Sequence, residues 1–405
     1  MKEPVLPDDV IYIINEIKKH GYEAYIVGGC VRDTIMGRRP NDWDITTSAV
    51  PEEVKKIFRH TVDTGIKHGT VTAVIGGRNY EITTYRIEGG YEDCRRPSSV
   101  SFTRDLHKDL LRRDFTSNAV AYSPEEGYVD IFGGMADIER KIIRGVGDPC
   151  ERFREDALRM LRAVRFSVQL DFEIESNTYN AIRENGALIK NISAERVREE
   201  LTKTLLGDYL DRLPVLWETG LIRHVSRPVY EGVYKNGGEI IGFIKKADKN
   251  IAEAFALFLD FVELDEALKF VKWLKFDGKT FNAIKKLLEN RRADIRPFYA
   301  DVRKAASNLG AEETRMLIDT ARAKGNAKAA EAGKILEEVI GNKEPLYIKD
   351  LKITGNDIMA MGVPKGREVG GMLNFLLDKV LDDPRLNTFE TLSVLTAEEL
   401  KKERF

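Results

Sequence analysis

The stretch YIVGGCVRDTIMGRRPNDWDITTS, residues 25–48, decides the fold of the first part of the chain. It sets an apolar, strand-like run against Gly28-Gly29, continues into a short polar helix, and then places Asp42 and Asp44 in a β-rich segment. Alternate residues of a strand point to the same face, so we expect the two carboxylates to lie side by side. Such a like-charge pair suits Mg²⁺, which takes one or two carboxylates plus substrate phosphates.

The glycine pair indicates what such a metal would serve. Gly28 and Gly29 allow backbone N–H groups to approach a phosphate without hindrance from a Cβ atom. Arg32, one turn into the following helix, is placed to add a charge-assisted contact to the same oxyanion. Together with the aspartates, these residues indicate nucleotidyl transfer with two metal ions. Taken alone, the aspartate pair is also compatible with a solvated strand edge.

The bulk composition is that of a soluble globular protein. The 405 residues are 42% hydrophobic and 32% charged, with a formal net charge of −2. No apolar run approaches the roughly 20 residues that span a bilayer, and the N-terminus lacks the apolar region of a secretion signal. The three cysteines occur singly, which argues against a disulfide framework or a thiolate zinc site. We therefore expect a cytoplasmic protein with no membrane partner.

The secondary-structure pattern changes along the chain. Helix signals, strand runs and a hairpin pattern over residues 70–86 predict a small mixed α/β unit, interrupted by a polar, loop-like stretch at 87–105. From about residue 135 onward nearly every segment has helical periodicity. The predicted fold class is α+β, with a small mixed-sheet head followed by an all-helical remainder.

Five motifs in one order resemble a known family. The run GG-x-VRD followed by DWD is similar to motif A of the nucleotidyltransferases that include template-independent tRNA nucleotidyltransferases and bacterial poly(A) polymerases. The similar motifs B to E are RRDFTSNA (112–119), YVDIFGGMADI (128–138), EDALRMLRAVRF (155–166) and ISAERVREEL (192–201). The segment ITGNDIMAMGVPKGREVGGML (353–373) further resembles the closing part of bacterial class II CCA-adding enzymes.

The resemblance implies a seahorse arrangement of four parts. These are a catalytic head, a helical neck that recognises the nucleobase, a helical body, and a helical tail that binds tRNA. On this sequence the predicted boundaries are 1–138, 139–206, 207–292 and 293–405.

The resemblance also assigns base reading to Asp156 and Arg159 of motif D. Cytosine and adenine each present an amino donor beside a ring-nitrogen acceptor, which a carboxylate and a guanidinium match. Uracil and guanine reverse both groups and would leave buried partners unpaired. If motif D is one helix, these residues form a ridge with Arg162 and Arg165. The resemblance makes Arg113, Arg162 and Arg165 nucleotide-binding, although such a row is by itself usually a solvated helix face.

The polar stretch at 87–105 resembles the flexible loop that CC-only relatives lack. We expect it to act as a lever when the preference changes from C to A. Its charged residues of interest are Glu92, Asp93, Arg95 and Arg96.

Three further residues are assigned outside the motifs. Glu81 is a candidate third acid by its strand position, with a solvated strand residue as the alternative. In the tail, Lys365 and Arg367 are predicted to contact tRNA, because they lie among glycines that precede or interrupt helices, and helix N-termini hold RNA phosphates. Ordinary helix caps are the alternative there.

The sequence thus predicts a class II CCA-adding enzyme that uses CTP, ATP and two Mg²⁺ ions. It would act on the 3′ end of tRNA and contact the acceptor end and the upper half of that molecule. Same-class alternatives are an A-adding enzyme and a poly(A) polymerase. A catalytically silent RNA-binding relative is the different-class alternative, and the intact aspartate pair, glycine turn and Arg32 argue against it.

Overall fold

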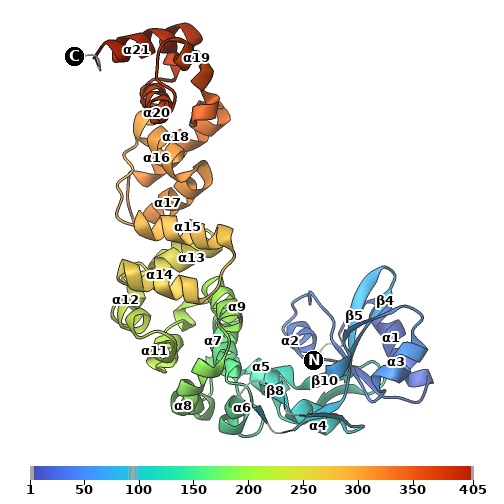
Figure 1. Ribbon diagram of the computed structural model, residues 1–405. Coiled ribbons are helices and arrows are strands. Elements are labelled where there is room, and N and C mark those ends of the chain that lie inside the picture. The colour runs from blue at the N-terminus through green and yellow to red at the C-terminus, as the bar shows by residue number, and fades with distance from the viewer. Residues whose placement is uncertain (1–3, 90, 93–95, 98, 403–405) are drawn as a thin grey trace. The chain divides into compact units, whose positions relative to one another are not determined.

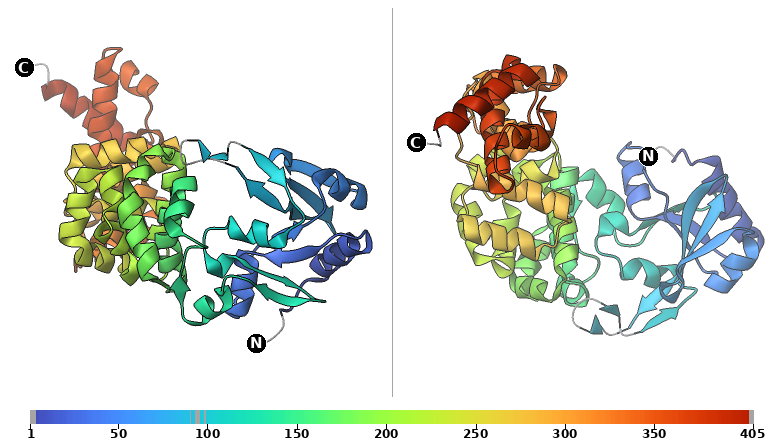
Figure 2. Two further views of the ribbon diagram at one scale, coloured as in Figure 1. Left: turned by 90° about the horizontal axis from the view of Figure 1, so that it is seen from below. Right: turned by 45° about the horizontal axis from the view of Figure 1, so that its top comes forward.

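The computed structural model describes residues 4–89, 91–92, 96–97 and 99–402. The chain divides into two compact units, Met1–Tyr234 and Lys235–Phe405. Among the described residues every strand lies before residue 175, and the later part of the chain is helical (Figures 1 and 2). None of the helices in this described part has the length and apolar character needed to cross a membrane.

A seven-stranded mixed sheet organises the first part of unit 1. Strands β2 and β5 are parallel, and all other neighbours in the sheet are antiparallel. In order across the sheet the strands are β11 (Gly127–Asp130), β10 (Val120–Ser123), β1 (Ala24–Val27), β2 (Ile45–Thr47), β5 (Arg78–Thr84), β4 (Thr70–Ile75) and β3 (Thr61–Gly65).

Alternate residues of the central strand β1 enter two separate hydrophobic clusters. Ala24 and Ile26 pack in the cluster that holds the buried residues of α1 (Asp8–Lys19) and Val54 of α3 (Pro51–Ile57). Tyr25 and Val27 pack in a second cluster with Leu110 of α4 (Leu106–Leu111). All four residues of β1 are buried, as expected for a strand covered on both faces.

The segment predicted as a loop at 87–105 contains short strands, so that prediction is corrected. Strand β6 (Arg86–Glu88) pairs with β9 (Val100–Phe102), and β7 (Tyr91–Glu92) pairs with β8 (Arg96–Pro97), both antiparallel. A two-stranded ribbon needs no buried apolar face along its whole length, so the polar sequence did not indicate strands. Asp93 and Arg95 lie outside the described residues, and the side chains of Glu92 and Arg96 are not described either.

The rest of the chain is built from helices. In unit 1 these are α2 (Gly29–Ile35), which follows β1, then α5 (Gly134–Glu139), α6 (Pro149–Glu155), α7 (Leu158–Leu170), α8 (Ser176–Asn185), α9 (Ala194–Leu205), α10 (Val215–Glu218) and α11 (Leu221–Val225), with a two-stranded parallel pair β12 (Ile142–Ile143) and β13 (Glu173–Ile174). Helix α12 (Arg227–Lys246) spans the division between the units.

Unit 2 is helical throughout its described residues. Its helices are α13 (Ile251–Phe258), α14 (Leu264–Trp273), α15 (Gly278–Glu289), α16 (Tyr299–Leu309), α17 (Ala311–Ala323), α18 (Ala329–Gly341), α19 (Gly355–Ala360), α20 (Arg367–Asp382) and α21 (Phe389–Lys402). The predicted division into head, neck, body and tail is finer than the two units and stays a prediction.

A chain of buried polar groups ties α7 to the sheet part of unit 1. Arg32 donates to Asn118 (Nη1 to Oδ1, 2.6 Å), and Asn118 donates to Asp114 (Nδ2 to Oδ1, 3.1 Å). Arg162 of α7 donates to the other oxygen of Asp114 (Nε to Oδ2, 2.8 Å). Burial by itself would raise the pKa of the Asp114 carboxyl, but Arg162 and the hydrogen bond from Asn118 bring it to about 2. The ionised carboxylate therefore stabilises the folded unit.

We expect Asp114→Asn to lower the free energy of unfolding by about 2 kcal/mol at pH 7, because the pKa of this carboxyl falls from about 3.9 when unfolded to about 2 when folded. A lowered folded-state pKa contributes fully above the unfolded value and is lost as the pH falls from about 4 towards 2. Urea unfolding of both proteins between pH 7 and pH 3 measures this, with the exposed Asp63→Asn as control. A difference that stays constant below pH 4 would contradict the assignment.

Candidate active site

The glycine turn after β1 brings three functional groups together. Gly28 has a φ of +84°, a conformation that favours glycine. A Cβ atom at Gly28 would lie 3.3 Å from Arg113 Nη1 and 3.7 Å from Asp44 Oδ2. At Gly29 it would lie 3.5 Å from Arg32 Nη2. The space beside this turn is therefore bordered by a carboxylate and two guanidinium groups, and a side chain at Gly28 would fill part of it.

Asp42 and Asp44 precede β2 and do not lie on it, which corrects the predicted strand position. Asp42 lies in a bend, after the turn-forming residues Pro40 and Asn41. The backbone oxygen of Asp44 accepts a hydrogen bond from the Val27 N–H (3.0 Å), so Asp44 continues the pairing with β1 beyond the end of β2. This bond, and not strand alternation, holds the aspartate beside the glycine turn.

Glu81 of β5 lies near Asp44, where Asp44 leads into β2. Strands β2 and β5 are parallel with Ile45 opposite Ile82, so the residues preceding these two are Asp44 and Glu81. Part of the Asp44 side chain is exposed, yet its carboxyl pKa is raised. Desolvation by the surrounding protein is the largest cause, Arg113 opposes it, and the charges of Glu81 and Asp42 add to it. Three acids thus share one region, although the described residues hold no group of three His, Cys, Asp or Glu side chains arranged as metal ligands.

The two arginines beside the turn differ in their partners. Arg32 is buried, donates to Asp33 Oδ1 through Nε (2.9 Å) and Nη2 (2.8 Å), and lies 5.1 Å from the ring centre of Phe166. Arg113 donates from Nη2 to Asp109 Oδ2 (3.3 Å). Its buried Nε has no hydrogen-bond partner among the residues that the structure describes. Arg113 therefore has more donor capacity left for an anion at the turn than Arg32 has.

Motif D is not one helix, so the predicted ridge is wrong at its first member. Helix α6 ends at Glu155, α7 begins at Leu158, and Asp156 between them is extended (φ −139°, ψ 102°). Asp156 Oδ1 accepts the Leu158 N–H (3.1 Å), which holds the break in place. Both carboxylate oxygens also accept from Arg196 of α9 (3.1 and 2.7 Å).

The three arginines predicted in motif D all lie on α7, and each is paired with an acid. Arg159 pairs with Glu155 (2.7 Å), Arg162 with Asp114 (2.7 Å), and Arg165 with Glu200 of α9 (2.6 Å). Arg162 and Arg165 also lie 5.3 and 3.9 Å from the ring centre of Phe166. The Phe166 ring is thus in contact range of arginines from both motif A and motif D, since Arg32 reaches it as well.

Sequence reasoning missed the acids and the arginine that hold these groups. The residues in question are Asp109, Asp114, Arg196 and Glu200. Three of them stand inside the quoted motifs B and E, and Arg196 and Glu200 are four apart on one helix, a spacing that puts them on one face. Asp109 lies outside every motif, but an acid within the leucine-rich run LHKDLL, which becomes α4, is itself a signal of a buried charge.

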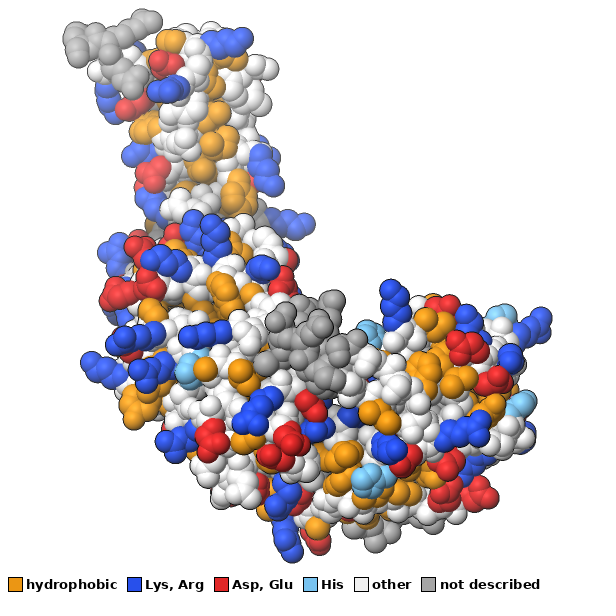
Figure 3. All heavy atoms as spheres, turned by 60° about the horizontal axis from the view of Figure 1, so that its bottom comes forward, with side chains coloured by type: hydrophobic (Ala, Val, Ile, Leu, Met, Phe, Trp, Pro, Cys, Tyr) orange, Lys and Arg blue, Asp and Glu red, His pale blue; other side chains and the backbone are white. Residues whose placement is uncertain are grey.

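The predicted tail residues are exposed. Lys365 precedes α20 and Arg367 opens it. The start of α19 at Gly355 is explained by a capping box of Thr354 and Asp357, so an ordinary cap accounts for that glycine. On the face drawn in Figure 3, Lys and Arg side chains are interspersed with Asp and Glu over much of the surface. The tRNA contacts of the tail stay a prediction.

Comparisons with known proteins agree with these motifs. The profile of the Poly A polymerase head domain matches residues 24–144, and that of a probable RNA and SrmB-binding site of polymerase A matches residues 171–230. The CCA-adding enzyme of Pediococcus pentosaceus is 38% identical over 397 residues, which cover 96% of this chain and 97% of that protein.

Solved structures match along the whole chain. The crystal structure of the Bacillus stearothermophilus CCA-adding enzyme in complex with CTP has a TM-score of 0.84 and 33% identity, covering 100% of this chain and 99% of that chain. The Thermotoga maritima CCA-adding enzyme complexed with tRNA has a TM-score of 0.62 over 98% of this chain and 97% of that chain, and at 21% identity this is a likeness of fold. The predicted α+β class is confirmed, and the chain belongs to the CCA-adding enzymes, a family of tRNA nucleotidyltransferases.

Proposed function

We propose that this protein adds C, C and A to the 3′ end of tRNA from CTP and ATP, without a template. The tRNA 3′-oxygen attacks the α-phosphorus, a new P–O bond forms, and pyrophosphate leaves. The observation that carries the proposal is the meeting of Asp44, Arg113 and the Gly28 turn in a chain related along almost its whole length to CCA-adding enzymes. The cytoplasmic location stays a prediction, as does the role of residues 87–105 in the change from C to A.

The residues at the turn suit a Mg²⁺ site. Asp42 and Asp44 offer oxygen donors, which this hard cation prefers, and Glu81 is a further candidate. The raised pKa of Asp44, caused by desolvation and by its acidic neighbours, is what a divalent cation would relieve. Because Gly28 has no Cβ atom, the side of the Asp44 carboxylate that faces the turn stays open. When bound, Mg²⁺ supplies charge that activates the 3′-hydroxyl and stabilises the leaving pyrophosphate.

The triphosphate and the base are bound by different parts of unit 1. The backbone at Gly28 and Gly29, with Arg113, binds the phosphates, since Arg113 Nη1 borders the turn while Nη2 is engaged by Asp109. Asp156 and Arg159 read the base. A carboxylate has about four acceptor positions, and Asp156 uses three on Arg196 and the Leu158 N–H, which leaves room for one amino group.

Arg159 likewise retains donors for a ring nitrogen. Its five N–H groups make three contacts in the described structure, to Glu155 and to the carbonyl oxygens of Arg152 and Arg112. Arg162 and Arg165 stay predicted nucleotide contacts. Because both are paired with acids, a nucleotide would share them with Asp114 and Glu200.

Incorporation of labelled CTP and ATP on three tRNA transcripts tests the proposal. The transcripts end before the first C, after CC, and after CCA. We expect C, C and A on the first, a single A on the second, and none on the third. Addition of A to the CC transcript with no addition to the first transcript would indicate an A-adding enzyme. A long A tail would indicate a poly(A) polymerase, and no incorporation at all would leave only RNA binding.

Removal of either aspartate tests the metal site. We expect Asp42→Ala and Asp44→Ala each to reduce incorporation of both nucleotides by at least about a thousandfold, or about 4 kcal/mol in barrier, because the charge on the leaving group loses its counter-ion. Binding of tRNA, measured by filter retention, should stay close to that of the wild type. The exposed Asp63→Ala, which removes a surface charge from the same sheet, is the matched control. Near-normal rates in either active-site variant would remove the assignment.

The base-reading role of Asp156 predicts a loss of selectivity. Asp156→Ala should slow C and A addition alike and narrow the preference over U and G by about ten- to a hundredfold, since a lost hydrogen bond to a charged group costs roughly 1.5–3 kcal/mol. Single-nucleotide incorporation with each of the four triphosphates measures this. Asp148→Ala, which removes an exposed cap of α6, is the control. Unchanged discrimination in Asp156→Ala would place base reading on other residues.

A further inference from the structure

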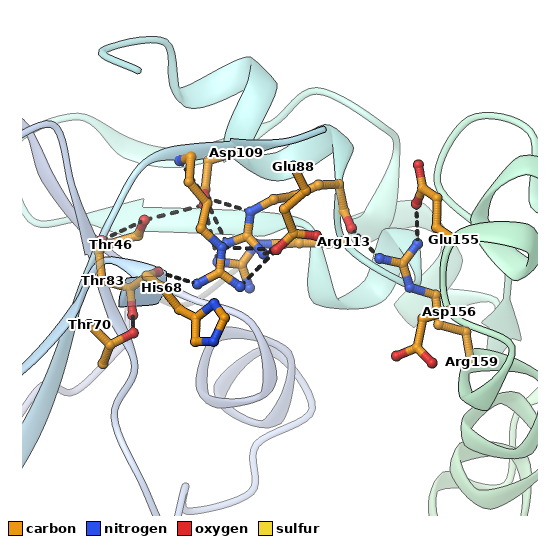
Figure 4. A network of polar contacts seen from close by, with 12 residues as sticks. Thr46, His68, Thr70, Thr83, Glu88, Asp109, Arg113, Glu155, Asp156 and Arg159 are labelled. Carbon is orange, nitrogen blue, oxygen red and sulfur yellow. Dashed lines mark hydrogen bonds and ion pairs between the residues drawn. The ribbon is translucent and has the colours of Figure 1, made fainter. Parts of the chain in front are cut away.

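A fully buried carboxylate, Asp109 of α4, lies at the centre of a polar network between the sheet and motif D (Figure 4). Its Oδ2 accepts from Thr46 Oγ1 of β2 (3.2 Å) and from Arg113 Nη2 (3.3 Å). Its Oδ1 accepts from Arg112 through Nε (3.0 Å) and Nη2 (2.8 Å), and from the backbone N–H of Arg86 (3.3 Å). One side chain therefore links strands β2 and β6 to two consecutive arginines of motif B.

The hydrogen bond to Asp109 sets the direction of the Arg113 side chain. Arg113 Nη2 is held by Asp109, and Nη1 of the same guanidinium is the atom 3.3 Å from a Cβ position at Gly28. The guanidinium is planar and rigid, so fixing one terminal nitrogen restricts where the other points. Within the described residues, Asp109 is the hydrogen-bond partner of this guanidinium, and its buried Nε has none.

A second branch leads from Asp109 to the base-reading residues. The guanidinium of Arg112 donates to Asp109, and the backbone oxygen of Arg112 accepts a hydrogen bond from Arg159 Nη2 (2.8 Å). Figure 4 shows Arg159, with Glu155 and Asp156, on the helical side of the network, and Asp109 with Arg113 on the sheet side. Arg112 thus contacts Asp109 through its side chain and Arg159 through its backbone.

A third branch reaches the start of the ribbon at 86–102. Glu88 of β6 pairs with Arg86 (2.8 Å) and with Arg112 (3.4 Å). Arg112 therefore lies between two acids, one fully buried and one at the base of the ribbon. The buried Asp109 accepts five hydrogen bonds from four residues, which makes it the member on which the others depend.

We propose that Asp109 is a positioning residue that holds Arg113 at the phosphate end and, through Arg112, Arg159 at the base end of one bound nucleotide. This inference rests on the proposed function, because it takes Arg113 and Arg159 as nucleotide contacts. The simpler alternative is that Asp109 only fastens α4 to the sheet. The two differ in what a change at Asp109 does to nucleotide binding in protein that remains folded.

Asp109→Asn removes the charge and keeps the volume. We expect KM for CTP and for ATP to rise at least tenfold, while KM for tRNA changes less than threefold, because the nucleotide contacts lose their fixed geometry. Asp148→Asn is the control: it changes an exposed acid that caps α6, outside the stretch at 87–105, and KM for both nucleotides should be unchanged. Steady-state kinetics measures KM for CTP on a transcript that ends before the first C, and KM for ATP and for tRNA on a transcript that ends after CC. Thermal unfolding shows whether the variants remain folded.

A variant cycle tests whether Asp109 acts through Arg113 and Arg159. If it does, Asp109→Asn in a background that carries both Arg113→Gln and Arg159→Gln should add less than threefold to the effect of that background alone. Effects that multiply would overturn the inference, as would a lowered unfolding temperature with unchanged KM values. If Asp109→Asn does not fold, Thr46→Val removes one donor to the same carboxylate, and a KM for ATP within 1.5-fold of wild type would overturn the inference. Failure of the wild-type protein to add any nucleotide would contradict the proposed function instead.

Discussion

The hydrogen bond from the Val27 N–H to the Asp44 carbonyl is the contact on which the site depends. It joins the last residue of β1 to the residue before β2, and so fixes the distance between the glycine turn and the acidic pair. Gly28 follows Val27 directly, and its positive φ turns the chain away from the sheet at that point. The carboxylate of Asp44 and the free side of the turn therefore face the same space, which Arg113 enters from motif B.

Much of this site follows from the sequence, because its parts are local. The strand, the glycine turn, the short helix and the close pair of aspartates occupy 24 consecutive residues, and the order of the five motifs identifies the family. Local sequence was less informative where long-range contacts determine the backbone conformation. Asp156 lies in a strongly helical pattern, and only its contacts with the Leu158 N–H and with Arg196 of α9 explain why the helix is broken there. Strands β6 and β9 escaped notice because they bury no regular apolar face.

Asp109 shows a different limit of sequence reasoning. No motif contains it. Arg112 and Arg113 follow it by three and four residues, but its other partners, Thr46 and Arg86, come from strands that reach it only in the folded protein. A buried charge with several donors is weak evidence for stability, since desolvation offsets much of the attraction. What such a group does reliably is to restrict the geometry of its partners, and in this fold those partners are arginines directed at the turn and at motif D.

The pairing of motif D with acids has a consequence for how salt affects the protein. Asp156, Arg159 and Arg165 each have a partner of opposite charge within hydrogen-bond distance, so the base end of the site carries little net charge before a nucleotide arrives. Selection of the base is then an exchange of short hydrogen bonds, which mobile ions screen weakly. Contacts to the phosphates of a nucleic acid weaken steeply with added salt. Raising the ionic strength should therefore weaken RNA binding and so lower the rate of nucleotide addition, while the selectivity between bases stays nearly constant.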